Sequence, residues 1–409
     1  MRVDPAVAAT NHARRGPMSS HPLSRGSAPP GSFHPRGDRR LMRCMPSKKQ
    51  PGRLHRALLD VELDAAQRAA VERPPGGAML VLGEAGHGKT TVALHRLAHL
   101  YRAAAGRFRA VFLVPSEGLA RLLQPLVTWL GVDVTVSTYD AWATRQAKRA
   151  FRDLPRRTSK TATAGVARVK RDPDVRALLD ELAARPPGVV DDDLDAPPPA
   201  TKAHAHRGDL QHLFGDRRLM GRLARAGDHA IEEVLEHTRV QFLLRGEAAN
   251  AHVDAPRLVT VDGRSLDSET PEHDAASFDV EDAAVMFELD RLRAARLGLK
   301  PTRPRAFDCV VVDEAQELAP LELALVGRSV APEGTLVVAG DADQQIDPGA
   351  YFDGWDATMR ELGAGAFERV VLEVGYRCPP EVVALARAVR DGVAVDPGRS
   401  RCFVAADER

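Results

Sequence analysis

The sequence predicts an α/β fold in which a parallel β-sheet carries helices on both faces. Short, nearly continuous apolar runs rich in β-branched residues recur along the chain, and segments with helical apolar spacing separate them. Runs of this kind are typical of strands that are buried on both faces of a parallel sheet. The predicted strands cover residues 78–82, 110–114, 132–136, 309–312 and 335–339, and a predicted helix at 54–71 precedes the first of them.

Length and composition set the class of protein. The 409 residues are enough for two or three domains, and 44% of them are hydrophobic, as in ordinary soluble globular proteins. No apolar run is long enough to cross a bilayer, so no membrane partner is expected. The 4 cysteines form no C-x-x-C pair. Neither a disulfide framework nor a zinc site is therefore predicted, and a cytoplasmic protein is expected.

Residues 1–53 differ in composition from the rest of the chain. They are rich in Arg, Pro, Gly, Ser and His and have no apolar periodicity. This composition predicts a disordered basic tail. Contact with nucleic acid through charge is one interpretation. A solvated tail, or residues upstream of a true start at Met18, Met42 or Met45, is the favoured one.

The segment from Gly83 to Thr90, GEAGHGKT, fits the phosphate-binding pattern G-x-x-x-x-G-K-[ST]. A predicted strand precedes it and a helical pattern follows it. Glycines let backbone N–H groups surround an anion, and a helix N-terminus adds partial positive charge. Lys89 is expected to contact the β- and γ-phosphates, and Thr90 to hold Mg²⁺. The predicted nucleotide-binding residues here are Gly83, Glu84, Ala85, Gly86, His87, Gly88, Lys89, Thr90 and Thr91.

Acidic and amide residues follow two later predicted strands. Asp313 and Glu314 follow the strand at 309–312, and Gln344 lies in GDADQ after the strand at 335–339. Open α/β sheets bind ligands at the carboxyl ends of their strands. Asp313 is expected to complete the Mg²⁺ shell, Glu314 to position or activate the attacking water, and Gln344 to sense the γ-phosphate. Each acid alone would fit a helix N-cap equally well, but beside a phosphate loop they favour a site for nucleotide hydrolysis.

Roughly 170 residues separate the third and fourth predicted strands, far more than a crossover needs. We therefore expect an inserted helical subdomain at 149–304, named the insert below. Its predicted helices cover 174–184, 230–244 and 280–297, and its predicted loops cover 186–206 and 263–279. His204 and His206 end the first loop, where solvated histidines are favoured over a metal site.

In chain order these segments resemble the motifs of UvrD/Rep-type superfamily 1 helicases. GEAGHGKT, DEAQ at 313–316 and GDADQ at 340–344 resemble motifs I, II and III. LEVGYRCP at 372–379 resembles motif IV, with Gly in place of Asn. The sequence from Gly88, GKTTVALHR, is most similar to the helicase IV/HelD branch.

Two shorter segments extend the resemblance. LDAAQ at 63–67 resembles the family's adenine-reading motif L-N-x-x-Q, with Asp in place of Asn. STYDAW at 137–142 resembles the segment whose Thr contacts single-stranded DNA. The resemblance implies that Gln67 reads the adenine, that Tyr376 stacks on it, that Arg377 contacts the γ-phosphate, and that Thr138 contacts DNA.

The family resemblance also implies a fold, an activity and a division of the chain. The fold is that of a RecA-like P-loop NTPase, and the activity is hydrolysis of ATP with Mg²⁺, coupled to binding of single-stranded DNA. The implied parts are a first RecA-like domain at 54–148 and 305–365, the insert at 149–304, and a stub of a second RecA-like domain at 366–409.

No segment after Arg377 resembles motif V or VI. We therefore expect a chain truncated after motif IV that does not unwind DNA alone, unless another chain supplies the rest of the second domain. Two alternatives stay open. One is a nucleotide-gated binding factor for a nucleic-acid machine such as RNA polymerase, and the other is a gene remnant.

Overall fold

The computed structural model describes residues 62–104, 108–151, 154, 157–158, 162–187, 202–223, 225–241 and 277–390. All described residues belong to the second of the two units into which the chain divides, residues 49–409. The predicted tail at 1–53 therefore lies outside the described residues. Within the described part, no helix combines the length and the apolar composition needed to cross a membrane.

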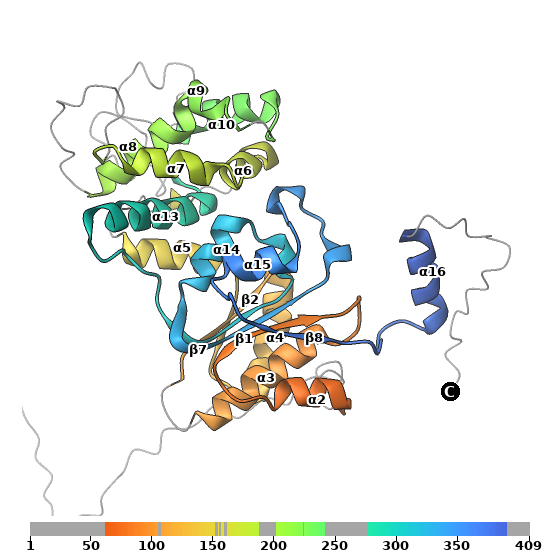
Figure 1. Ribbon diagram of the computed structural model, residues 1–409. Coiled ribbons are helices and arrows are strands. Elements are labelled where there is room, and N and C mark those ends of the chain that lie inside the picture. The colour runs from red at the N-terminus through yellow and green to blue at the C-terminus, as the bar shows by residue number, and fades with distance from the viewer. Residues whose placement is uncertain are drawn as a thin grey trace, which may run out of the picture. The chain divides into compact units, whose positions relative to one another are not determined.

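A six-stranded parallel sheet forms the centre of the second unit, and its strand order is β3-β2-β6-β7-β1-β8 (Figure 1). The strands are β1 Gly77–Leu82, β2 Ala110–Val114, β3 Thr135–Thr138, β6 Phe307–Val312, β7 Val330–Gly340 and β8 Glu368–Val371. Every pair of neighbouring strands is parallel. The predicted fold class is therefore confirmed.

Helices cover both faces of this sheet because successive strand residues face opposite sides. Met79 and Phe112 belong to a buried cluster on one face, whereas Leu80 and Leu113 belong to a cluster on the other. The first cluster includes α2 (Ala65–Val71), α3 (Lys89–Ala103) and α4 (Glu117–Trp129). The second includes α5 (Tyr139–Ala150), α13 (Val280–Leu297), α14 (Pro320–Gly327) and α15 (Trp355–Glu361). Figure 1 shows the two sets of helices on opposite sides of the sheet.

The chain between β3 and β6 folds into helices that extend the second cluster. They are α6 (Ala164–Lys170), α7 (Val175–Ala183), α8 (Lys202–Gly215), α9 (Arg217–Met220) and α10 (Asp228–Gln241), with a parallel pair of strands, β4 (Arg157–Thr158) and β5 (Ser277–Phe278). Phe214, Phe278 and Phe287 are fully buried within this part. The insert therefore shares one hydrophobic core with the face of the sheet that carries α5 and α13.

The prediction of a loop at 186–206 is wrong at its end. His204 and His206 lie in helix α8, which begins at Lys202. His206 is 9% exposed, and its ring packs against Phe151 at 4.7 Å between centroids. This packing gives the segment an apolar contact that its polar composition did not indicate.

Other boundaries also differ from the prediction, and β7 begins at Val330 instead of residue 335. Strand β3 begins at Thr135 instead of residue 132, because the N–H of Val132 closes the end of α4 by donating to Val127 O at 3.1 Å. Helix α2 begins at Ala65 because the side chain of Asp64 caps it. The part of that predicted helix at 54–61 lies outside the described residues.

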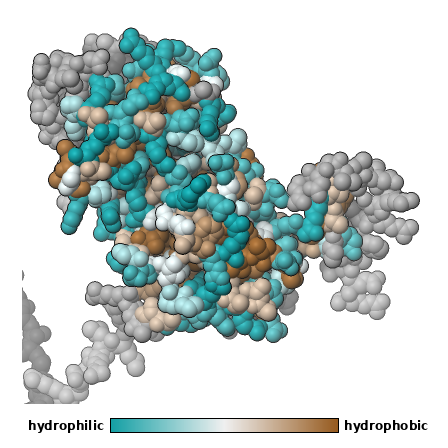
Figure 2. Space-filling view, viewed as in Figure 1, coloured by the Kyte–Doolittle hydropathy of each residue, from teal (hydrophilic) through white to brown (hydrophobic). Residues whose placement is uncertain are grey.

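Strand β8 joins the sheet beside β1, in register from Met79↔Glu368 to Leu82↔Val371. We expected residues 366–409 to form a stub of a second RecA-like domain, so the pairing of this strand with the first sheet is a correction. The residue that follows the strand explains the position, since Leu372 is 2% exposed against the cluster of α2, α3 and α4. Hydrophobic surface lies near β8 in Figure 2, and Val371 is 55% exposed. Helix α16 (Pro380–Arg390) ends the described part.

Candidate nucleotide-binding site

The loop from Gly83 to Gly88 connects β1 to α3 and contains two glycines in the left-handed region. Gly86 has a φ of 82° and Gly88 a φ of 85°. A Cβ at Gly86 would lie 2.5 Å from the Cβ of Arg377, and a Cβ at Gly88 would lie 2.6 Å from Nε2 of Gln67. Only glycine fits both the backbone conformation and the space, so the loop can curl round an anion.

Lys89 begins helix α3 and extends across this loop. Its Nζ donates to the carbonyl oxygens of Gly83 at 2.7 Å and Glu84 at 3.3 Å, and it lies 3.7 Å from a carboxylate oxygen of Asp341. Lys89 is only 5% exposed. Gly88, the N-cap of helix α3, provides no side-chain acceptor for the first N–H groups of the helix. A buried ammonium and a helix N-terminus with uncapped N–H groups together form a site for an anion.

Thr90 and Asp313 form the part of the site that suits a divalent cation. The Thr90 hydroxyl donates to Oδ2 of Asp313 at 2.8 Å, whereas Oδ1 of Asp313 is buried without a hydrogen-bond partner. Burial, and next the neighbouring charge of Glu314, raise the pKa of Asp313 to about 7. A bound cation would give Oδ1 of Asp313 a partner and would offset the cost of burying the charged carboxylate.

The coordination chemistry fits Mg²⁺ in particular. Among the described residues, no group of three or more His, Cys, Asp or Glu side chains could hold a metal ion. Mg²⁺ typically takes one or two protein oxygen ligands and completes its shell with phosphates and water. Thr90 and Asp313 are therefore residues that could hold Mg²⁺ beside a nucleotide.

Glu314 and Gln344 lie in one hydrogen-bonded network at the carboxyl edge of the sheet. Glu314 has a φ of 54°, a strained backbone conformation that functional sites often contain. Its carboxylate accepts from Nε2 of Gln316 at 2.8 Å, and the Gln316 side-chain oxygen accepts from the backbone N–H of Asp341 at 3.3 Å. The Gln344 amide donates to Asp341. The network thus joins Glu314 and Gln344 to Asp341, whose carboxylate lies 3.7 Å from the ammonium of Lys89.

A cavity of about 390 Å³ contains most of the residues that the sequence predicted. Its lining includes Gln67, Ala85, Gly86, His87, Gly88, Lys89, Thr90, Thr91, Glu314, Gln344, Tyr376 and Arg377. The backbone N–H of Tyr376 donates to Gly86 O at 3.0 Å. The segment that resembles motif IV therefore lies directly against the phosphate loop.

Gln67 lines this cavity, but its side chain is bound within the protein. Its Oε1 accepts from the Asp64 N–H at 3.2 Å, and its Nε2 donates to His87 O at 3.3 Å. Only 1% of Gln67 is exposed. Asp64 also caps α2, a role that the resemblance did not include, although the spacing D-x-x-Q is a signal for a capping box. The role of Gln67 in reading adenine stays a prediction.

Two predicted loop residues have side chains that bind the C-terminal segment. His87 is buried, and its Nδ1 lies 2.6 Å from Leu372 O. Glu84 accepts from Arg387 of α16, with 2.9 Å between Oε1 and Nε and 2.8 Å between Oε2 and Nη2. The sequence analysis missed Arg387, since nothing in its local pattern marks an ion pair with a residue so far away in the chain.

Thr138 lies outside the nucleotide cavity. Its hydroxyl accepts from the Ala141 N–H at 3.2 Å and caps helix α5. It lines a second cavity, of about 660 Å³, whose acidic lining residues are Asp140, Glu281, Asp313, Glu314, Glu317, Glu322 and Asp347. The basic lining residue of this cavity is Arg171. The excess of negative charge in this cavity would repel a nucleic-acid backbone. The DNA contact of Thr138 stays a prediction.

The strand, glycine loop and helix, with an acidic residue at the end of β6, define a P-loop nucleotide-binding protein of the α/β class. A family model described as an AAA domain matches residues 67–350, and the chain belongs to this family. The family is a P-loop domain found in UvrD/Rep-like helicases, so the chain is helicase-like. No curated protein matches the chain in sequence at a significant level.

Proposed function

We propose that this chain hydrolyses ATP and that its nucleotide state controls its binding to single-stranded DNA, as in superfamily 1 helicases. The observation that carries the proposal is the carboxylate of Asp313. One of its oxygens accepts from Thr90 at 2.8 Å, and the other is buried without a partner. Glu314 is the next residue in the chain, so a cation ligand and a carboxylate that can act on water are adjacent.

Each residue of the site has a part in this mechanism. Lys89 would bind the β- and γ-phosphates in place of the loop carbonyls that it now contacts. Glu314 would orient and deprotonate the attacking water, and Gln344 would contact the γ-phosphate. Arg377, which lines the same cavity, would stabilise the charge that develops on the transferred group.

Mg²⁺, held by Thr90 and Asp313, would neutralise charge on the phosphates when it is bound. The remaining residues of the loop bind and orient the nucleotide. The uncapped N–H groups at the start of α3 would donate to phosphate oxygens. Tyr376 is 49% exposed at the cavity, so its ring is free to stack on a base.

Titration calorimetry with ATP tests the proposal. We expect binding that needs magnesium, and a loss of about 2–3 kcal/mol of binding free energy in Lys89→Ala, because charge-assisted bonds to phosphate are strong. Equal affinities of the variant and the parent would contradict the nucleotide site. Binding of labelled single-stranded DNA, with and without a non-hydrolysable ATP analogue, tests the coupling. Identical DNA affinities in both conditions would contradict it.

One observation favours a second function. The second cavity, which Thr138 and Glu314 both line, is strongly acidic. Its charge suits a protein partner with basic groups better than a phosphate backbone. The second candidate is therefore a nucleotide-gated binding factor, with RNA polymerase as the partner that the helicase IV/HelD resemblance names. Nucleotide-dependent binding to purified RNA polymerase, without measurable binding to single-stranded DNA, would favour this candidate over the first.

A further inference from the structure

Two neighbouring basic residues at the end of helix α6 bind to different parts of the protein. Lys170, the last residue of α6, is fully buried inside the insert. Its ammonium donates to Asp279 and Asp282, both at 2.7 Å, and to Gln241 at 3.0 Å. Gln241 ends α10, Asp279 precedes α13 and Asp282 lies within it. Lys170 therefore ties α6 to two other helices of the insert, and breaking such a buried pair is strongly destabilising.

Arg171, the next residue, instead contacts the carboxyl edge of the sheet, where the loops after β6 and β7 lie. Its guanidinium donates to the Glu322 carboxylate at 2.9 Å and to the backbone oxygen of Glu317 at 2.7 Å, and it forms an ion pair with Asp347. The side chains of Arg171 and Glu322 are 12% and 6% exposed. Solvent screens a contact of this kind much less than a surface ion pair.

Glu322 lies in helix α14, but the other two partners of this guanidinium belong to two loops that also carry the predicted catalytic groups. Glu317 lies three residues after Glu314 in the loop after β6, and Asp347 lies three residues after Gln344 in the loop after β7. The loops also contact each other, because the Glu317 carboxylate accepts from the backbone N–H of Asp347 at 3.2 Å and of the preceding residue at 2.9 Å. One arginine of the insert thus contacts both loops.

The loop after β7 also reaches the phosphate-binding lysine. Gln344 donates to Asp341, and a carboxylate oxygen of Asp341 lies 3.7 Å from Nζ of Lys89. A nucleotide that draws Lys89 toward its phosphates would change the charge beside Asp341. That change would act on Gln344, and through the same loop on Asp347, the partner of Arg171.

We infer that Arg171 is a positioning residue that couples the insert to the nucleotide site. In one direction, the nucleotide-dependent position of the loop after β7 sets the position of α6. In the other direction, the insert holds the two loops, and with them Glu314 and Gln344, in place for hydrolysis. This inference rests on the proposed function, and it goes beyond it by assigning a role to a residue of the insert.

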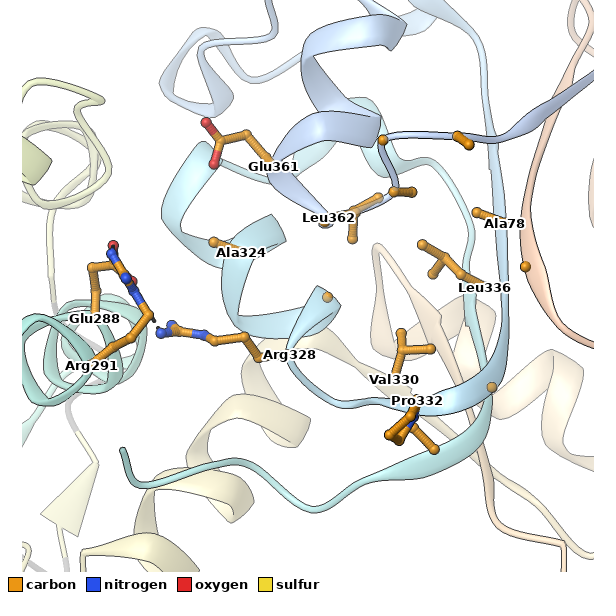
Figure 3. Close-up of a pocket in the computed structure, with 18 of the residues that line it drawn as sticks. Ala78, Glu288, Arg291, Ala324, Arg328, Val330, Pro332, Leu336, Glu361 and Leu362 are labelled. Atoms are coloured by element: carbon orange, nitrogen blue, oxygen red, sulfur yellow. Dashed lines mark hydrogen bonds and ion pairs between the residues drawn. The ribbon is translucent and has the colours of Figure 1, made fainter. Parts of the chain in front are cut away.

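Arg176 provides a matched control. It lies on α7 of the insert and also binds the core, donating to both carboxylate oxygens of Glu361 at 2.9 and 2.6 Å. Glu361 lines a cavity of about 690 Å³ at the amino ends of β1 and β7, away from the phosphate loop (Figure 3). Arg176→Met therefore breaks an ion pair between the insert and the core without touching the loops that carry Glu314 and Gln344.

The experiment compares the full chain with Arg171→Met and Arg176→Met. It measures ATP affinity, the kcat of magnesium-dependent hydrolysis, and hydrogen exchange of α6 with and without a non-hydrolysable ATP analogue. For Arg171→Met we expect ATP affinity within about threefold of the parent, a kcat about 5- to 30-fold lower, and no effect of nucleotide on exchange in α6. For Arg176→Met we expect kcat and the nucleotide effect on exchange to match the parent.

Equal losses of kcat in the two variants would overturn the inference, because they would show only a general need for a docked insert. If the ATP analogue still changes the hydrogen exchange of α6 in Arg171→Met, the inference is overturned as well. If Arg171→Met does not fold, Asp347→Asn removes the negative charge that Arg171 contacts on the loop after β7, from a side chain that is 47% exposed, and losses in the same direction are expected. A parent chain that binds no ATP would refute the proposed function itself, a result distinct from these.

Discussion

The hydroxyl of Tyr376 donates to the carboxylate of Asp64 at 2.6 Å, and this bond joins residues 312 positions apart in the chain. It lowers the pKa of Asp64 and raises the pKa of Tyr376. Together with the bond from Tyr376 N–H to Gly86 O, it holds the tyrosine ring at the nucleotide cavity. Asp64 both caps α2 and binds the tyrosine.

The hydroxyl and the ring of Tyr376 can be tested separately by substitution. Tyr376→Phe removes the hydroxyl and keeps the ring, so we expect ATP affinity to stay within about threefold of the parent, since a partly exposed bond contributes little. Tyr376→Ala removes the stacking surface, and we expect a loss of at least about tenfold. Calorimetric titration of both variants provides the measurement. A loss in Tyr376→Phe as large as in Tyr376→Ala would show that the hydroxyl, and not the ring, matters for binding.

The phosphate loop should not tolerate a side chain at position 88. Gly88→Ala forces alanine into a left-handed conformation with a φ of 85° and places its Cβ 2.6 Å from Nε2 of Gln67. We expect a loss of about 1–3 kcal/mol of stability and no measurable nucleotide binding. Gly118→Ala is the control, because the nearest atom to its Cβ is the Ser116 hydroxyl at 3.9 Å. Normal ATP binding by Gly88→Ala would contradict the assigned loop geometry.

Removing the charge of Glu314 should separate binding from hydrolysis. In the parent, Nε2 of Gln316 donates to the Glu314 carboxylate at 2.8 Å. Glu314→Gln keeps the size of the side chain and an oxygen that can accept this bond. We therefore expect unchanged ATP affinity and a rate of hydrolysis lower by about 100-fold or more, because an amide cannot accept the proton of the attacking water. Phosphate release under saturating magnesium and ATP measures this. Hydrolysis at the parental rate would exclude Glu314 as the base.

Local patterns predicted the phosphate loop and most of the strands. The glycine spacing between Gly83 and Gly88 reports a backbone conformation that only glycine adopts, so it can be read from the sequence alone. The buried strands at 110–114 and 309–312 are continuous apolar runs and were predicted nearly to the residue. Patterns of this kind are encoded within about ten residues of the chain, which is why they can be recognised without a structure.

Contacts between distant segments could not be predicted in this way. The apolar residues Val370, Val371 and Leu372 are typical of a strand but do not indicate its neighbour, and the position of β8 beside β1 depends on the burial of Leu372 against α2 and α3. The contacts of Arg171 join residues 146 to 176 positions apart. No local spacing marks such pairs, because side chains on separate elements come together only when the whole sheet is formed.

The pH dependence of stability should reveal the burial of the Glu281 carboxylate, which lines the acidic cavity. Burial raises the pKa of Glu281 from 4.5 to about 7, although the positive charge of Lys170 opposes the shift. Below pH 4.5 Glu281 is protonated in both the folded and the unfolded chain, so it costs no stability there. Between pH 4.5 and 7 the unfolded chain ionises first, and the folded state loses stability as the pH rises.

Glu281→Gln removes this titration. The stability of the variant relative to the parent should therefore increase from pH 4.5 to 7 and stay constant above pH 7. One pKa unit corresponds to about 1.4 kcal/mol, and Glu281 is only partly buried by surface area, so a gain of at most about 3 kcal/mol is expected. Asp313 titrates in the same range and Asp279 near pH 2, but both are present in the two proteins and cancel in the comparison.

Urea unfolding at pH 5, 6, 7 and 8 provides the measurement for Glu281→Gln and the parent. Glu333→Gln, at an exposed position in β7, is the control and should follow the parent at every pH. A difference between Glu281→Gln and the parent that stays constant over this range would mean that Glu281 is ionised in the folded chain. The acidic cavity would then tolerate its full charge, and the electrostatic argument for a basic protein partner would become stronger.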